Sequence, residues 1–199
     1  MSVQPSDESL MLSYRDGDLL AFKELYRRHS KGLYVFIAWR SPRKEWVDEI
    51  AQDSWANLHQ ARARYYPQAS FRTYLFQIAR NRLIDQLRQQ QRTVLASELG
   101  PCDDEGERFD ALADAWHDGA SPESTLSEKQ QLERLHRALR ALPDEQRESL
   151  VLQQFNGMSL EEISSLVSAP VETVKSRLRY AMRKLRQQLD NSTAQGVRP

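Results

Sequence analysis

Apolar residues recur every three or four positions through most of the chain, which is the period of amphipathic helices. The first such segment predicts a short helix over Ser6–Tyr14, ended by Asp16 and Gly17. A long helix is predicted from Leu19 until the Ser41-Pro42 dipeptide. Sustained alternation of apolar and polar residues, the mark of a strand, is not found, so the pattern favours helices throughout.

Two further helices are predicted in the first half of the chain. One covers residues 45–64, and the other begins at Phe71 and runs out in the sequence LRQQQR. The intervening residues 65–70 are predicted as a loop, because Pro67 lacks a backbone donor and disfavours helix at Tyr66. The first half therefore predicts a helical bundle.

Helical spacing resumes after an acidic stretch without periodicity. Ser127 and Gln130 form a capping box ahead of a leucine-rich helix, and Pro143 ends that helix and begins another. Ser159 and Glu162 form a second capping box. The last two predicted helices are Leu160–Val167 and one that carries the apolar stripe Val171–Leu189.

These elements predict an all-α protein with two small helical domains joined by a flexible acidic linker. The expected boundaries are 1–95 for the first domain, 96–126 for the linker, 127–190 for the second domain and 191–199 for a disordered tail. Hydrophobic residues make up 40% of the chain, and no signal sequence or membrane span is predicted. The lone Cys102 allows no intramolecular disulfide, so a cytoplasmic protein is expected.

The net charge of zero conceals three charged blocks. Residues 62–92 hold seven arginines and one aspartate, a net charge of +6. Residues 97–128 hold ten acids and one arginine, and residues 171–186 hold six bases and one acid. Two basic blocks on either side of an acidic one favour nucleic-acid contact in both domains.

The last two helices, separated by a break at Ser168–Pro170, are typical of a helix-turn-helix. The start of the second helix of such a motif meets base edges in the major groove, and its other cations bind phosphates. Base reading is therefore assigned to Glu172, Thr173, Lys175, Ser176 and Arg179, and phosphate binding to Arg177, Arg183, Lys184 and Arg186.

The basic block of the first domain differs, because its arginines alternate with aromatic residues. Aromatic rings stack on unpaired bases, and a loop before a basic helix can enclose one flipped base. By itself this signal is weak, since aromatic residues at helical spacing are more often core. Tyr74 and Phe76 are expected to be partly buried.

Three segments together resemble the extracytoplasmic-function (ECF) group of sigma-seventy family transcription initiation factors. VDEIAQDSWANLHQA (Val47–Ala61) is similar to the region two segment that grips the β′ clamp helices of RNA polymerase. Ser70–Arg92 is similar to the segment that melts and reads the −10 promoter element, and Leu139–Arg186 to region four, which reads the −35 element. Leu19–Trp39 is similar to the first region two helix.

The resemblance implies a set of partners and contact residues. The partners are core RNA polymerase, through its β′ clamp and β flap, promoter DNA, and an anti-sigma factor that holds some relatives near the inner membrane. It also implies that the linker runs through the RNA-exit region. The implied clamp contacts are Asp48, Gln52 and Asp53, and the implied −10 contacts are Phe71, Arg72, Tyr74, Arg80 and Asn81.

Two residues depart from the family pattern. Ser168 and Glu172 stand where the family commonly has glycine. Ser168 is expected either to need a different turn or to accept backbone strain. Glu172 is expected either to accept from a cytosine amino group or to repel phosphate, which leaves the preferred −35 sequence open.

A two-domain helix-turn-helix regulator with an N-terminal sensing domain is the alternative. Nucleotide-binding, hydrolase and zinc-protease motifs are absent and the four histidines are scattered, so no enzyme, cofactor, metal site or small-molecule substrate is expected.

Overall fold

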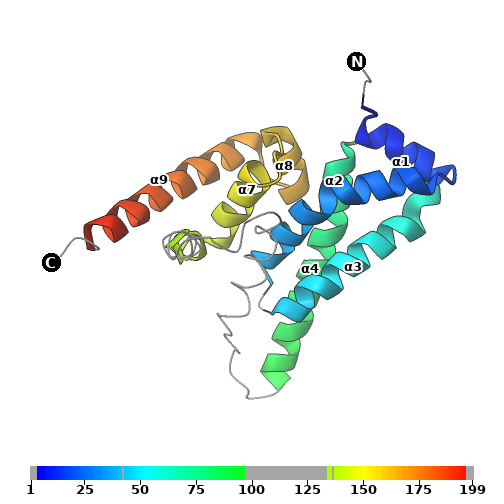
Figure 1. Cartoon of the computed structure of the whole chain (residues 1–199). Coiled ribbons are helices and arrows are strands. Elements are labelled where there is room, and N and C mark those ends of the chain that lie inside the picture. Colours follow the sequence, from blue (N-terminus) through cyan, green and yellow to red (C-terminus); the bar gives the residue numbers. More distant parts are fainter. Residues whose placement is uncertain (1–3, 42, 97–133, 136, 196–199) are drawn as a thin grey trace, which may run out of the picture. The chain divides into compact units, whose positions relative to one another are not determined.

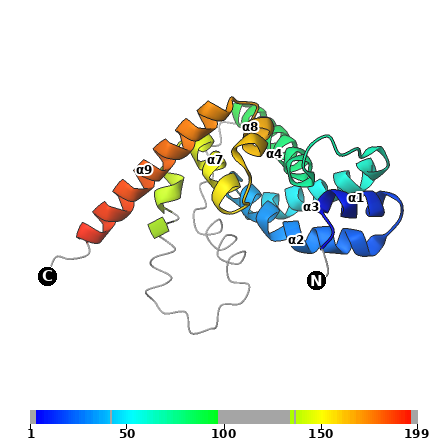
Figure 2. The same ribbon diagram turned by 90° about the horizontal axis from the view of Figure 1, so that it is seen from above.

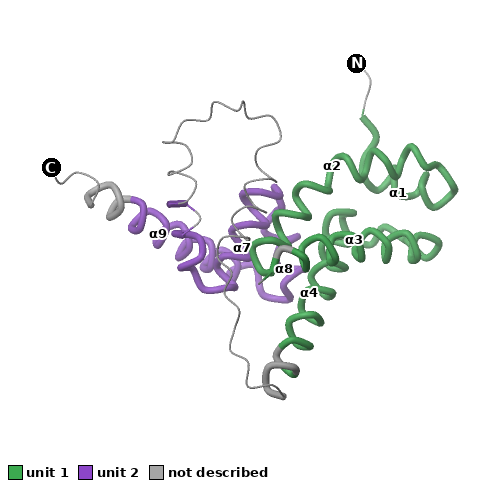
Figure 3. The backbone as a smooth tube through the Cα atoms, turned by 60° about the horizontal axis from the view of Figure 1, so that its bottom comes forward, with its two compact units in different colours: residues 1–104 green, residues 105–199 purple. Residues whose placement is uncertain are grey.

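The computed structural model describes residues 4–41, 43–96, 134–135 and 137–195. Every regular element in these residues is a helix. They belong to two compact units, Met1–Asp104 and Glu105–Pro199 (Figure 3). The prediction of an all-α protein with two helical regions is therefore confirmed. The capping box at Ser127 and nearly all of the predicted linker lie outside the described residues.

Unit 1 is a bundle in which helix α2 lies at the centre, packed against α1, α3 and α4 (Figure 1). Each helix contributes apolar side chains to one core, including Met11, Phe36, Ile50 and Leu75, all at most 1% exposed. The four helices are α1 (Asp7–Arg15), α2 (Leu19–Ala38), α3 (Lys44–Ala61) and α4 (Phe71–Ala96), with a short 3-10 turn at Arg62–Arg64.

Local signals set the helix boundaries of unit 1. Asp18 accepts hydrogen bonds from the amides of Leu20 and Ala21 at 2.8 and 3.4 Å, which caps α2. Gly17 adopts φ 109°, a conformation that favours glycine, directly after α1. The helix predicted over residues 45–64 instead ends as a 3-10 turn, and α4 continues to Ala96.

Unit 2 is built from α7 (Asp144–Gln154), α8 (Leu160–Val167) and α9 (Val171–Gln195). Helix α9 packs on both α7 and α8 and runs on beyond them (Figure 2). Because α9 reaches Gln195, residues 191–195 are helical rather than part of the predicted tail. The core side chains include Leu139, Leu150, Val151, Leu152, Ile163, Leu166, Val174 and Ala181.

The predicted capping box at the start of α8 is present. The Ser159 hydroxyl accepts the Glu162 amide at 3.1 Å, and the Glu162 carboxylate accepts the Ser159 amide at 2.8 Å. Both amides belong to a helix terminus that has no backbone acceptor of its own. These two side chains therefore define where the first helix of the helix-turn-helix begins.

Candidate nucleic-acid interface

The turn between α8 and α9 forces Ser168 into the left-handed region, at φ 54° and ψ 46°. It is the only non-glycine residue with positive φ in the part of the chain described. The Ser164 hydroxyl steadies the turn by donating to the Ala169 carbonyl at 2.6 Å. Serine at this position thus accepts the backbone strain that glycine avoids.

We expect Ser168→Gly to raise the free energy of unfolding of unit 2 by about 0.5–1 kcal/mol, because relief of left-handed strain outweighs the added freedom of the unfolded chain. Urea denaturation of the full chain measures the change. Ser165→Gly is the matched control, because Ser165 is exposed inside α8. This change should lower the free energy of unfolding by up to about 1 kcal/mol, because glycine is a poorer helix former than serine. Equal destabilisation by both changes would contradict the strain.

The candidate DNA face of α9 lies opposite its buried stripe. Val174, Leu178, Ala181 and Leu185 turn into the core of unit 2. Of the residues assigned to the −35 element from the sequence, Thr173, Ser176 and Arg177 are partly buried. The exposed ones are Glu172, Lys175, Arg179 and Arg183. The same helix therefore presents a polar surface at its N-terminal half, where recognition helices meet bases.

Ion pairs divide the cations of this face into two kinds. Lys175 contacts Glu172 at 2.7 Å, and this hydrogen bond raises the pKa of Lys175. Arg177 contacts Glu145 of α7 at 2.6 Å, and its side chain is only 18% exposed. Arg177 therefore braces α9 against α7. Arg179 and Arg183 form no ion pair with any described residue, so their charges face solvent.

The sequence did not single out Tyr180 as a site residue, yet it lies between the two unpaired arginines. The guanidinium carbons of Arg179 and Arg183 lie 5.5 and 5.0 Å from the centre of its ring. Both distances are within the range of a cation–π contact. The ring of Tyr180 is 41% exposed. Tyr180 therefore limits the freedom of the two exposed guanidinium groups on this candidate face.

The candidate −10 residues of unit 1 divide between core and surface. Phe71 has no exposed surface and belongs to the core, so we do not include it among the residues that meet DNA. Phe76 is also buried, as expected, and Tyr74 is partly buried. Arg72 and Arg80 are partly exposed and Asn81 is exposed, where it accepts a 2.9 Å hydrogen bond from Gln77.

The loop before α4 combines one buried and one exposed tyrosine. Burial raises the pKa of Tyr65 to about 12 and also raises that of Tyr74, so both hydroxyls stay neutral. Their ring centres are 5.3 Å apart, which fixes the loop against α4. Tyr66 is 74% exposed. The loop therefore presents one free ring of the kind on which an unpaired base stacks.

The candidate clamp face lies on α3. Asp48 and Gln52 are exposed, whereas Asp53 accepts a 2.7 Å hydrogen bond from Arg82 of α4. Asp53 therefore links two helices of the bundle. One helical turn beyond Gln52, Trp55 contacts Tyr26 of α2 with ring centres 5.0 Å apart. Tyr26 is 48% exposed and extends this face onto α2.

Other kinds of site are not seen in the residues that the structure covers. Within these ranges no three histidine, cysteine or acidic side chains gather closely enough to hold a metal ion. None of the described helices combines the length and hydropathy needed to cross a bilayer.

Comparison with known proteins identifies the class. The family described as "Sigma-70 region 2" matches residues 25–93, and that described as "Sigma-70, region 4" matches residues 132–185. Together the matches cover well over half of the chain and contain the candidate faces. The chain belongs to the sigma-70 family, and within it to the ECF group. It is a sigma factor that directs RNA polymerase to promoters, and not an enzyme.

Individual relatives match over most or all of the chain. The ECF RNA polymerase sigma-E factor of Salmonella typhi is 27% identical over 198 residues, covering 100% of both chains. The RNA polymerase sigma-H factor of Pseudomonas aeruginosa is 27% identical, covering 89% of this chain and 91% of its own. CnrH, solved in complex with the cytosolic domain of CnrY, has a similar fold, with a TM-score of 0.65 and 23% identity over 94% of this chain and 99% of that one.

Proposed function

We propose that this sigma factor reads a −35 element with α9 and melts and reads a −10 element with α4 and its preceding loop. The exposed polar face of α9, set on a capped helix-turn-helix, is the observation that carries the proposal. The −35 residues are Glu172, Thr173, Lys175, Ser176, Arg179 and Arg183, with Arg177 bracing the helix. The −10 residues are Arg72, Tyr74, Arg80 and Asn81, with Phe71 supporting them from the core.

Mapping of transcript start sites tests the assignment of the −35 element to α9 and of the −10 element to α4 and its preceding loop. The purified chain is mixed with bacterial core RNA polymerase and genomic DNA fragments, and the run-off transcripts are sequenced. We expect discrete start sites that share two motifs at a fixed spacing. Start sites with only a downstream motif would contradict the role of α9. The preferred upstream motif also shows which base Glu172 selects. A glutamate side chain can accept a hydrogen bond from the amino group of cytosine.

Unit 1 is proposed to dock on the β′ clamp through Asp48 and Gln52, and unit 2 on the β flap. We expect the double change Asp48→Ala and Gln52→Ala to weaken core binding about tenfold or more without lowering the melting temperature, because both side chains are exposed. Asp53→Ala should instead lower the melting temperature, since Asp53 pairs with Arg82. Equilibrium binding to core polymerase and thermal denaturation measure the two effects. Normal core affinity of the double variant would contradict this docking face.

Regulation and location are proposed on the same basis. CnrH was solved bound to the cytosolic domain of CnrY, and the sigma factor RpoE of Bartonella quintana was solved bound to the anti-sigma factor NepR. The similar fold of these two proteins suggests an anti-sigma factor for the present chain. Such a partner is proposed to cover the polymerase-binding faces of the two units and to hold the protein in the cytoplasm, near the inner membrane. Co-purification of the chain from its native cells, with and without an inducing stress, tests for this partner.

A further inference from the structure

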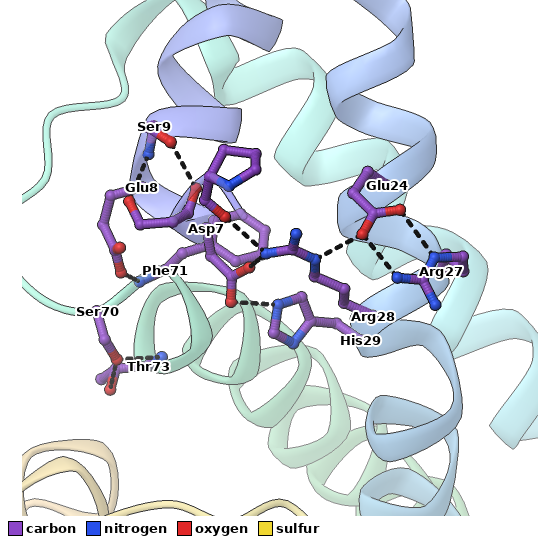
Figure 4. A network of polar contacts seen from close by, with 12 residues as sticks. Asp7, Glu8, Ser9, Glu24, Arg27, Arg28, His29, Ser70, Phe71 and Thr73 are labelled. Carbon is purple, nitrogen blue, oxygen red and sulfur yellow. Dashed lines mark hydrogen bonds and ion pairs between the residues drawn. The ribbon is translucent and has the colours of Figure 1, made fainter. Parts of the chain in front are cut away.

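Helix α1 supplies a hydrogen bond to the first residue of α4. The Glu8 carboxylate accepts the Phe71 amide at 2.9 Å, across 63 positions of sequence (Figure 4). The first amides of a helix have no acceptor within it, so an outside group must satisfy them. The Ser70 hydroxyl accepts a hydrogen bond from the Thr73 amide at 3.2 Å. Glu8 therefore completes the cap of α4 from another helix.

The neighbouring acid, Asp7, orients the side chain that packs on Phe71. The Asp7 carboxylate accepts a hydrogen bond from the Arg28 guanidinium at 2.8 Å and contacts Nε2 of His29 at 2.7 Å. His29 is 7% exposed, and its ring centre lies 5.3 Å from that of Phe71. Burial lowers the pKa of His29, partly opposed by Asp7, so the imidazole is neutral at neutral pH. Helix α1 thus holds the backbone of Phe71 directly through Glu8, and its ring indirectly through the contact of Asp7 with His29 of α2.

Phe71 joins helix α4 to the loop of residues 65–70. Tyr65 at the start of the loop is buried, whereas Tyr66 is 74% exposed. The far end of the loop is fixed by Ser70, whose hydroxyl contacts that of Thr73 at 2.9 Å. A site that binds a flexible strand gains affinity when its groups are already in place, because less ordering is needed on binding. Tyr65 holds one end of the loop against Tyr74, so movement at Phe71 would shift the other end, at Ser70, relative to it.

We propose that Asp7 and Glu8 are positioning residues for promoter melting. They hold the first turn of α4 so that the loop and its exposed Tyr66 are set to receive a base from the unpaired −10 strand. This inference rests on the proposed role of α4 in −10 recognition. It assigns to the short N-terminal helix α1 a function in promoter opening that acts through Phe71, without contact to DNA.

Promoter opening by the holoenzyme tests the proposal. The probe is a promoter found by run-off mapping, with a fluorescent adenine analogue in its −10 element. We expect Glu8→Ala to slow opening about tenfold, and Glu8→Gln to stay within about twofold, because its side-chain oxygen still accepts the Phe71 amide. Asp16→Ala, which removes a charge from the other end of α1, should leave the rate unchanged. Binding of all variants to core polymerase and to a −35 duplex should match the wild type.

The outcomes separate this inference from the function on which it rests. If Tyr66→Ala and Arg80→Ala slow opening but Glu8→Ala does not, the positioning role is wrong and the −10 face stands. Equal slowing by Glu8→Gln and Glu8→Ala would also overturn the role, because charge and not the cap would then matter. If Tyr66→Ala and Arg80→Ala leave opening normal, the −10 assignment itself is wrong. A matching loss of core and −35 binding in Glu8→Ala would reveal general unfolding and overturn the inference.

Discussion

Replacing Phe71 with alanine is expected to lower the free energy of unfolding of unit 1 by about 3–5 kcal/mol. Phe71 has no exposed surface, and its ring packs on His29. The change removes a large buried ring and leaves a cavity where α1, α2 and α4 meet. Denaturation of the full chain by urea, followed by circular dichroism, measures the loss. A loss below about 1 kcal/mol would contradict a core role.

A conservative change separates the core role of Phe71 from contact with DNA. Phe71→Leu keeps much of the apolar volume, and we expect it to cost about 1 kcal/mol and to leave promoter opening near normal. Tyr66→Ala should have the opposite effect, slow opening with little loss of stability, because Tyr66 is 74% exposed. A stable Phe71→Leu variant that failed to open promoters would show that opening needs the aromatic ring of Phe71 and not only its apolar volume.

The double change Arg179→Gln and Arg183→Gln is expected to weaken promoter binding by the holoenzyme about 100-fold. Neither arginine is paired with a described acid, and both lie against the ring of Tyr180. A base contact or a phosphate contact by arginine contributes on the order of 1–3 kcal/mol. Binding to the mapped promoter is measured over a range of salt concentrations. The slope of affinity against salt should fall by about one for each phosphate contact removed.

The single variants distinguish a residue that reads bases from one that binds phosphates without regard to sequence. Arg179→Gln should relax the preference for particular bases in the −35 element, whereas Arg183→Gln should weaken all sequences alike and reduce the salt slope. Tyr180→Leu should reproduce part of both effects, because the two guanidinium groups lose their shared ring. Lys31→Gln, an exposed change on α2, is the control for lost charge. Identical sequence preferences in wild type and Arg179→Gln would contradict base reading.

Local chemistry in the chain was sufficient to predict the helices and some of their boundaries. The Ser159–Glu162 capping box and the valine–leucine stripe of α9 act within a few residues, so the sequence contains all of their partners. The strain at Ser168 follows from the same local geometry, since a short helical turn needs a left-handed residue. The ECF resemblance, the two helical regions and the absence of an enzyme function were predicted and are confirmed.

What the sequence could not decide is which polar and aromatic residues are available for contact. Phe71 and Tyr66 are both aromatic and five positions apart, yet one is buried and the other exposed. Gln52 and Asp53 are neighbours in the sequence, but Gln52 is exposed, whereas Asp53 accepts a hydrogen bond from Arg82, 29 positions away on α4. Helical periodicity gives only the direction of a side chain around its own helix. Whether that side chain is exposed depends on which side chains of the neighbouring helices pack against it.

The sequence by itself determined the helices, the capping box that begins α8 and the helix-turn-helix, because these depend on residues within one or two turns of each other. The class of protein followed from the resemblance of several separate segments to one family. Only the tertiary structure decided that Arg177 pairs with Glu145 and that Glu8 completes the cap of α4. Those contacts join residues 32 and 63 positions apart, and the packing of helices around a shared core brings them within hydrogen-bond distance.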